Sequence, residues 1–559
     1  MSSLSTGANP VRDTCSLTGH GALAVGDLLY FQGGRMIYNW QIGWGGYGQN
    51  PYLRVLNFTN SVNQQNVADS IITVQSDTAP FNYDGETIQD TRLPLFWLDE
   101  AGDKAYLAGG AMVNIANTSY IGGRDWNPGK PGKMWTADVQ RGNILNNWEE
   151  VDMLIGGKKA NLIGSGANWF DSESRVGYAF GGSYLDGAEY DYAVNQLLMF
   201  NVTSGQWKNT TTPFDQSAAG FLHGLTLEGR TVLIAGLGST NGQEGAVNTI
   251  RVYDTESDQW YTQLTNGDLP ANRFWSGCSV IVAAQDKSSY QIITYGGADN
   301  SVTYGDVWAL SIPSFTWTQL SDDVSSTVAA GPRYASSCTL MKNHTIVVIG
   351  GNKVIDADTY NFPNCDLNSD LAYFFDLNIQ GWTSQISSGA QDEYRVPSPV
   401  YEAIGGNAQG GATLTQPPGG FNQAGMSTVF AAFATAPPST TSGSPGTTTS
   451  TGGPSNTSTP SKSSNTGLIA GVVVGVVALI GIIAFGVWFF IIRRRRREEA
   501  TPTPPPPPDQ DKYPTELGGA GYDHAMELHG NQPSLELYGS SPHSPSPIAP
   551  THGLHEVPA

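Results

Sequence analysis

Charged residues are scarce in this sequence, and basic residues are the scarcest. Asp, Glu, Lys and Arg make up 14% of the 559 residues, with 28 basic against 49 acidic side chains and a formal net charge of −21. Nucleic-acid binding depends on Lys and Arg that neutralise phosphates, so nucleic acid is not the expected partner. The low charge density together with 67 Gly favours an all-β, turn-rich fold over a helical one.

Metal-binding and catalytic motifs are missing as well. His20, His223 and His344 are the three histidines before residue 468, and the sequence contains no His-Glu-x-x-His, Cys-x-x-Cys, Gly-x-Ser-x-Gly or phosphate-binding motif. We therefore expect no metal, no cofactor and no catalytic residue. Acidic residues such as Asp186 and Glu189 leave a glycosidase open, because sequence gives no distance between carboxylates.

One long apolar run divides the chain. Residues 468–492 contain no charged or strongly polar side chain, and as a helix they would extend about 37 Å, enough to cross a bilayer. Arg493–Arg497 follows directly, and positive charge beside a span marks the cytoplasmic side. The sequence predicts a single-pass plasma membrane protein with its N-terminus outside and its C-terminus inside.

The N-terminus does not look like a secretory leader. The first fifteen residues have neither a basic segment nor an apolar core of a signal peptide. We expect residues 1–14 to be flexible and a leader to be missing from the sequence as given. The alternative is a cytosolic protein held by a late membrane anchor.

Both sides of the predicted span have the composition of disordered segments. Residues 433–467 are rich in Ser, Thr, Pro and Gly, which is typical of an extended, O-glycosylated stalk. In the tail, residues 493–559, the run Pro504–Pro508 favours a polyproline II helix that an SH3, WW or EVH1 domain could bind. Gly467, Gly471 and Gly475 form a small-residue strip that predicts a homodimer.

Asn-x-Ser/Thr sequons support the outward placement of the large N-terminal region. All of them precede the predicted span, as expected for N-glycosylation outside the cell. The predicted glycosylation sites are Asn57, Asn117, Asn201, Asn209, Asn343 and Asn456.

An internal repeat organises this region. A short apolar strand ending in small residues occurs six times, at 28–34, 105–110, 177–182, 232–236, 292–297 and 346–351. A second pair of strands follows in each unit, and the last strand commonly carries a Trp. These tryptophans include Trp207, Trp260, Trp317 and Trp382, which we expect to be core residues.

The recurring glycine pair, aromatic and Trp resemble the kelch motif over residues 15–386. The resemblance implies an all-β, kelch-type β-propeller of six or seven four-stranded blades, with residues 15–432 as the ectodomain. Residues 394–430 contain a further Ile-Gly-Gly and could form a seventh blade or a strand that closes the ring. Overall, the chain resembles fungal single-pass membrane proteins with an extracellular kelch propeller, a stalk and a Pro-rich tail.

The resemblance also implies which side chains surround the ring axis. One inner-strand position is occupied in successive units by His20, Trp97, Trp169, His223, Cys278 and Cys338. These residues could line a ligand-binding mouth or simply pack the inner strands. Galactose oxidase also carries a kelch propeller, but its copper site needs two imidazoles, two tyrosines and a Tyr–Cys link, a pattern that this sequence does not match.

Two long loops combine aromatic residues with Gly, acids and amides. Aromatic faces stack on sugar rings, and binding residues concentrate on loops of a rigid scaffold. These loops therefore predict glycan binding through Trp40, Trp44, Tyr47, Tyr184, Tyr190 and Tyr192.

The four cysteines all precede the predicted span. Closure of the ring could bring Cys15 and Cys365 together as a disulfide. Cys278 and Cys338 occupy equivalent inner-strand positions and could equally be small buried thiols.

These observations together predict a non-enzymatic cell-surface binding or adhesion protein. Its propeller would bind a protein or glycan ligand outside the cell, and its tail could recruit cytoplasmic partners. The alternative is an extracellular carbohydrate-active or galactose-oxidase-like enzyme.

Overall fold

The computed structural model describes residues 14–434, with gaps in the connections between strands, the longest at 39–47, 74–81, 114–125 and 353–370. Residues 1–444 form one compact unit and residues 445–559 a second. The predicted span and tail lie outside the described residues, as does the stalk beyond Ala434. Among the helices that are described, none is both long enough and apolar enough to cross a membrane.

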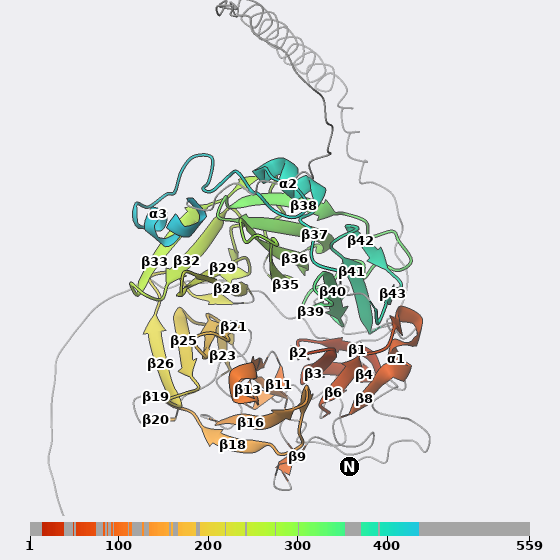
Figure 1. Ribbon diagram of the computed structural model, residues 1–559. Coiled ribbons are helices and arrows are strands. Elements are labelled where there is room, and N and C mark those ends of the chain that lie inside the picture. The colour runs from red at the N-terminus through yellow and green to blue at the C-terminus, as the bar shows by residue number, and fades with distance from the viewer. Residues whose placement is uncertain are drawn as a thin grey trace, which may run out of the picture. The chain divides into compact units, whose positions relative to one another are not determined.

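Six sheets, each built on four antiparallel strands, form the blades of a propeller (Figure 1). The sheets of blades 2 and 5 each include one further short strand, β17 (Asn143–Ile144) and β34 (Asn266–Gly267). Within each blade the strands pair in chain order from the ring axis outwards, and a short hairpin joins the first strand to the second. The first three blades are β2 (Gly21–Val25), β3 (Leu28–Gln32), β6 (Arg54–Asn57) and β8 (Ile71–Thr73); β12 (Leu95–Asp99), β13 (Lys104–Ala108), β16 (Lys133–Gln140) and β18 (Glu149–Asp152); and β21 (Ala167–Asp171), β22 (Val176–Phe180), β25 (Gln196–Asn201) and β26 (Gln206–Thr211).

The other three blades follow the same plan. They are β28 (Phe221–Leu227), β29 (Arg230–Gly236), β32 (Thr249–Asp254) and β33 (Gln259–Leu264); β35 (Trp275–Ala283), β36 (Tyr290–Ala298), β37 (Thr303–Ile312) and β38 (Thr316–Ser321); and β39 (Ser337–Met341), β40 (Thr345–Ile349), β41 (Ala372–Asp376) and β42 (Gly381–Thr383). Each inner strand contacts the inner strand of the next blade, and β39 contacts β2. The ring therefore closes with six blades, which decides between the six and seven that the sequence allowed.

At three of the blade junctions a glycine pair connects one blade to the next. Gly182 N donates to the carbonyl of Ser217, in the segment that leads into the next blade, at 2.8 Å. A β-carbon on Gly181, whose φ is +62°, would lie 2.2 Å from that carbonyl oxygen, so a larger residue has no room there. The same arrangement recurs at Gly296–Gly297 with Arg333 and at Gly350–Gly351 with Leu17.

The predicted core tryptophans fill the space between blades. Trp207 and Trp317 are buried, and Trp260 and Trp382 are half-buried against aromatic neighbours. Trp207, for example, stacks on Phe200 with ring centroids 4.7 Å apart, within an apolar cluster shared by blades 2 and 3. These positions confirm the structural role that the repeat predicted.

The N-terminal segment closes the ring against blade 6. Strand β1 (Thr14–Thr18) precedes blade 1, and Gly351 N donates to Leu17 O at 2.7 Å, as at the other blade junctions. An ion pair of 2.8 Å joins Lys342 of blade 6 to Asp27 of blade 1. The junction between the first and last blades is thus made by the same kinds of contact as the others.

Residues 392–434, here called the strap, follow blade 6 and run over the outside of blades 6, 5 and 4. The strap contains α2 (Ser398–Ile404), α3 (Gly425–Val429) and α4 (Ala431–Ala434), so it supplies neither a seventh blade nor a closing strand (Figure 1). Phe430 is 1% exposed and packs against Phe315 of blade 5. Helix α4 continues to Ala434, past residue 432, where the sequence analysis placed the end of the ectodomain.

The strap also covers the outer edge of blade 4. Asn422 Oδ1 accepts the backbone N–H of Leu264 at 2.7 Å, and Gln423 Oε1 accepts that of Thr262 at 2.8 Å. Both donors belong to β33, whose outer side would otherwise present unpaired N–H groups to other chains. Side-chain amides here take the place of a further strand.

The remaining described elements are short and lie in connections. They are β4 (Arg35–Tyr38), β5 (Gly48–Gln49), β7 (Val62–Asn63), η2 (Gln64–Asn66), α1 (Val67–Ser70), β9 (Asn82–Tyr83), β10 (Glu86–Thr87), β11 (Thr91–Arg92), η3 (Glu100–Gly102), β14 (Ala111–Val113), β15 (Trp126–Asn127), β17 (Asn143–Ile144), β19 (Leu154–Ile155), β20 (Lys158–Lys159), β23 (Ser183–Leu185), β24 (Asp191–Ala193), β27 (Ser217–Ala218), β30 (Ser239–Thr240), β31 (Gln243–Glu244), β34 (Asn266–Gly267) and β43 (Gln385–Ile386). Strand β43 pairs with β7, which adds a further link between the two ends of the ring.

Candidate functional site

All six inner strands contribute to one cavity of about 240 Å³ on the ring axis. The cavity lies towards the ends where these strands begin. Because neighbouring strands are antiparallel, the connections between second and third strands also leave from this side of the ring, which we call the loop face. The opposite side carries the tight hairpins between first and second strands, and we call it the hairpin face. The side chains that determine the chemistry of the wall are His20, Phe96, Asn168, Phe221, His223, Cys278, Ser279, Ser337 and Cys338.

Two predicted residues, His20 and His223, line this cavity, and each is paired with a serine of a neighbouring blade. His20 Nε2 lies 2.7 Å from Ser337 Oγ, and His223 Nε2 lies 2.8 Å from Ser279 Oγ. Burial lowers the pKa of both imidazoles to about 3, with a further contribution from the Arg54 charge at His20. Both histidines are therefore neutral hydrogen-bonding groups at physiological pH.

A disulfide joins the two cysteines of the inner strands. Cys278 of blade 5 is bonded to Cys338 of blade 6, so the interpretation of these residues as buried thiols is wrong. The reason is geometric: equivalent positions on adjacent inner strands bring the two Cα atoms to 5.2 Å, within disulfide range. Both residues line the cavity.

The disulfide and the two histidine–serine pairs form one series across four blades. His223 and Ser279 link blades 4 and 5, Cys278 and Cys338 link blades 5 and 6, and Ser337 and His20 link blades 6 and 1. We call these six residues the inter-blade belt. Each serine is the direct neighbour of a cysteine in sequence, so the belt holds one side of the cavity wall in place.

The belt histidines are expected to make the stability of the propeller depend on pH. The pKa of each histidine is lower in the folded than in the unfolded chain. Each neutral imidazole therefore makes its full contribution to the free energy of unfolding above about pH 6.5. This contribution is lost as pH falls towards 3, by up to about 1.4 kcal/mol per pH unit for each histidine. Urea unfolding of His223→Gln between pH 7 and 5 should show a shallower loss than the parent chain.

His344 provides a matched control of opposite sign. Its Nε2 lies 3.5 Å from Asp376 Oδ2, and the hydrogen bond with this carboxylate raises its pKa, so its contribution is lost as pH rises. His344→Gln should therefore steepen the fall in stability with acidification. Equal pH slopes for His223→Gln and the parent chain would contradict the burial argument.

The two inner-strand tryptophans occupy packing positions between blades. Trp97 is 2% exposed, and its Nε1 donates to Asn168 Oδ1 at 3.0 Å. Trp169 stacks on Tyr178 and lies over Gly224, where a β-carbon would come within 2.2 Å of its ring. Neither indole is part of the cavity wall, because both side chains turn from the inner strand into a blade interface.

The predicted loop aromatics and the predicted Cys15–Cys365 disulfide lie mostly outside the described residues. Trp40, Trp44, Tyr47, Tyr190 and Cys365 are outside the described residues. The backbone of Tyr184 in β23 pairs directly with that of Tyr192 in β24, so these two predicted residues share one hairpin of blade 3. Glycan binding by this hairpin and the Cys15–Cys365 disulfide both stay predictions.

Four of the six sequons lie in the described part of the chain, and Asn117 and Asn456 do not. Asn209 and Asn343 are exposed, whereas Asn57 and Asn201 are half-buried. Asn57 and Asn201 each accept a backbone N–H from their own turn, at 2.8 and 2.9 Å. Exposure thus favours Asn209 and Asn343 as glycan acceptors among the described sites.

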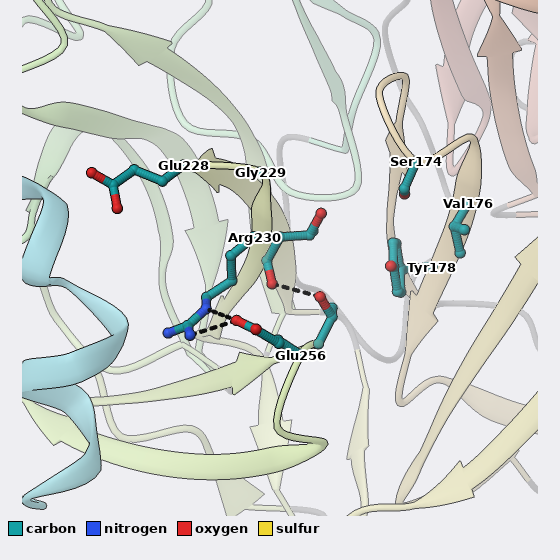
Figure 2. Close-up of a pocket in the computed structure, with 9 residues that line it drawn as sticks. Ser174, Val176, Tyr178, Glu228, Gly229, Arg230 and Glu256 are labelled. Atoms are coloured by element: carbon teal, nitrogen blue, oxygen red, sulfur yellow. Dashed lines mark hydrogen bonds and ion pairs between the residues drawn. The ribbon is translucent and has the colours of Figure 1, made fainter.

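A second pocket, of about 380 Å³, lies between blades 3 and 4 on the hairpin face. Figure 2 shows Arg230 paired with Glu256, while Tyr178 and Ser174 lie across from them on blade 3. Asp254 lies 3.5 Å from the same guanidinium, so two carboxylates already balance the charge of Arg230. The charge of Arg230 is therefore already neutralised and does not make this pocket an anion site.

The other hydrogen-bonding side chains of the central cavity belong to residues that the sequence analysis did not predict as site residues. Ser279 and Ser337 bond the predicted histidines, and Asn168 bonds Trp97. A possible signal was the serine beside each inner-strand cysteine, in Cys278-Ser279 and Ser337-Cys338. No group of three His, Cys, Asp or Glu suited to a metal ion occurs in the described ranges.

Comparison with known proteins matches a family described as the KLHDC2/KLHL20/DRC7 Kelch-repeats domain, over residues 102–351 and 222–402. A Kelch repeat-containing protein of Arthroderma benhamiae is 35% identical over 238 residues, which cover 38% of this chain and 35% of the relative. Kelch domain-containing protein 10 of Rattus norvegicus and of Mus musculus is 25% identical over 147 residues, 26% of this chain and 33% and 31% of those proteins. The chain thus spans about a third of the length of the curated relatives it matches.

Proposed function

Because the chain belongs to the kelch-repeat family, whose propellers commonly mediate protein binding, we propose that it is a cell-surface binding protein that holds its ligand at the central cavity. The ligand would be a protein or a glycan outside the cell. The observation that carries this proposal is the cavity itself, to which all six blades contribute and whose wall is tied together by the inter-blade belt.

The chemistry of the wall favours binding over catalysis. A serine hydroxyl bonded to a histidine acts as a nucleophile most readily when a carboxylate orients the imidazole by bonding its second ring nitrogen. His20 Nδ1 is buried and has no hydrogen-bond partner among the described residues. The histidines of the belt therefore fit a role as neutral wall groups, and an oxidase and hydrolase activity panel tests the enzymatic alternative.

Blocking the cavity tests the proposed site. Gly166 lines the cavity, and a β-carbon added there meets no atom closer than 3.4 Å, so Gly166→Leu adds a bulky apolar side chain at the cavity wall without a clash at its β-carbon. Residues 1–444, which form a compact unit with a closed ring, would be screened on glycan arrays and displayed surface proteins. We expect Gly166→Leu to reduce ligand binding at least tenfold.

Gly419→Leu is the matched control, because Gly419 lies in the strap and a β-carbon added there would have no atom within 4 Å. This variant should bind like the parent chain. Equal binding by Gly166→Leu and the parent would place the ligand elsewhere and refute the cavity as the site.

The proposed location is tested separately in cells that make the full chain. If the propeller lies outside, peptide N-glycosidase should shift the mobility of the chain, and a C-terminal epitope should need permeabilised cells for detection. The variant Asn209→Gln combined with Asn343→Gln should reduce the shift, because these are the two most exposed described sequons. An unshifted chain with an accessible C-terminal epitope would contradict this orientation.

A further inference from the structure

We propose that the central cavity binds one uncharged, hydroxyl-bearing ring, the size of a single neutral hexose residue at the end of a glycan. The proposal rests on the binding function proposed above and adds the chemical class of the ligand. Three properties of the described wall support it: its charge, its hydrogen-bonding side chains, and the volume that it encloses.

The described part of the wall carries no ionised group. Its described polar side chains are amide, hydroxyl and imidazole, and both imidazoles are neutral because burial lowers their pKa. Arg54 acts electrostatically on His20, but it is fully buried and is not part of the wall. A charged ligand would lose its hydration here without a counter-charge, which costs several kcal/mol.

Polar and apolar groups are interspersed around the described cavity wall. Phe96 and Phe221, of blades 2 and 4, belong to the apolar clusters of blade interfaces, and the polar Asn168 of blade 3 lies between these two blades. A sugar ring likewise combines apolar C–H groups with hydroxyls. A purely aliphatic ligand would leave the polar groups of the wall unpaired.

The polar side chains of the wall can still form hydrogen bonds to a ligand after their bonds within the protein are made. Each serine hydroxyl has one bond to a histidine and can still bond a ligand hydroxyl. Asn168 Oδ1 accepts from Trp97 Nε1, which leaves the Asn168 amide nitrogen as a donor. The cavity can therefore both donate to and accept from hydroxyls, as recognition of a sugar requires.

The volume limits the ligand to one ring. An apolar cavity of about 150 Å³ holds a benzene molecule. The central cavity, at about 240 Å³, has room for one six-membered ring with its hydroxyl substituents. The rest of a glycan would lie outside the cavity.

The proposal is tested with methyl hexosides as probes and residues 1–444 as the protein. Saturation-transfer NMR titrations would compare the methyl glycosides of glucose, galactose and mannose with glucuronate and glucosamine, which have similar rings but carry a charge. We expect at least one neutral methyl hexoside to bind at least tenfold more tightly than either charged sugar. Equal or tighter binding of a charged sugar would overturn the proposed ligand class.

Asn168→Asp places a carboxylate in the wall with almost no change of shape. The Asp oxygen can still accept from Trp97 Nε1, so the propeller should unfold at the same denaturant concentration as the parent. Binding of the neutral hexoside should fall at least tenfold, while the exposed control Ser204→Ala should bind normally. Unchanged hexoside binding by Asn168→Asp would refute the role of this cavity in holding the sugar.

Failure of this proposal is distinguishable from failure of the binding function. If no hexoside binds, but a displayed protein binds and is lost in Gly166→Leu, the ligand class is wrong and the cavity remains the binding site. If no hexoside, glycan or protein binds in a way that depends on Gly166 or Asn168, both the ligand class and the proposed site are refuted.

Discussion

Loss of the Cys278–Cys338 disulfide should lower the free energy of unfolding by about 4 kcal/mol, the value that the chain-entropy relation gives for a loop of this size. The two cysteines are separated by 60 residues, so the cross-link restricts a long stretch of the unfolded chain. It also joins the inner strands of blades 5 and 6 directly. Denaturant unfolding of Cys278→Ala combined with Cys338→Ala measures the effect.

The single variants distinguish a cross-link from two independently packed side chains. Either substitution opens the disulfide, so each single variant should lose nearly as much stability as the double variant. If the two single losses were small and added up to the loss of the double variant, the cysteines would be acting as separate core residues. That result would refute the stabilising role of the cross-link.

Phe430→Ala in the strap is expected to reduce the free energy of unfolding by about 3–5 kcal/mol. Phe430 is 1% exposed, packs edge-on against Phe315 with ring centroids 5.6 Å apart, and stacks on Phe421 at 5.5 Å. Its removal would leave a cavity in the apolar cluster that blades 4 and 5 share with the strap. Chemical denaturation followed by tryptophan fluorescence would report the loss.

Phe430→Leu is the appropriate comparison, since it keeps an apolar side chain and should lose clearly less stability than Phe430→Ala. A loss below about 1 kcal/mol for Phe430→Ala, the size of an ordinary surface change, would show that the strap is not part of the folded core. The strap matters because it covers the outer edge of blade 4 with side chains of Asn422 and Gln423.

The repeats could be found from sequence because they reflect local rules. Alternating apolar positions predict strands, and glycine pairs mark points where the chain turns against the next blade. The prediction was least accurate where a blade departs from the pattern. In blade 4 the two residues at positive φ are Leu237 and Gly238, not the pair ending at Gly236 that the sequence indicated.

The candidate site was only partly predictable for a different reason. Equivalent inner-strand positions do not point the same way in every blade, so the same alignment selected His20 and His223 on the cavity wall and Trp97 and Trp169 at blade interfaces. Large indole rings gain most from burial between sheets, where Gly177 and Gly224 leave room for them. Sequence alignment carries no information about that choice.

The amino-acid sequence alone predicted an all-β kelch propeller through its resemblance to the kelch motif, because spacing, glycine pairs and Trp positions are properties of the individual repeats. The number of blades, the Cys278–Cys338 disulfide, the histidine–serine pairs and the strap emerged only from the folded chain. Each of these depends on residues far apart in sequence that meet when the ring closes. Local sequence patterns cannot specify these long-range contacts, because closure of the ring depends on all six blades together.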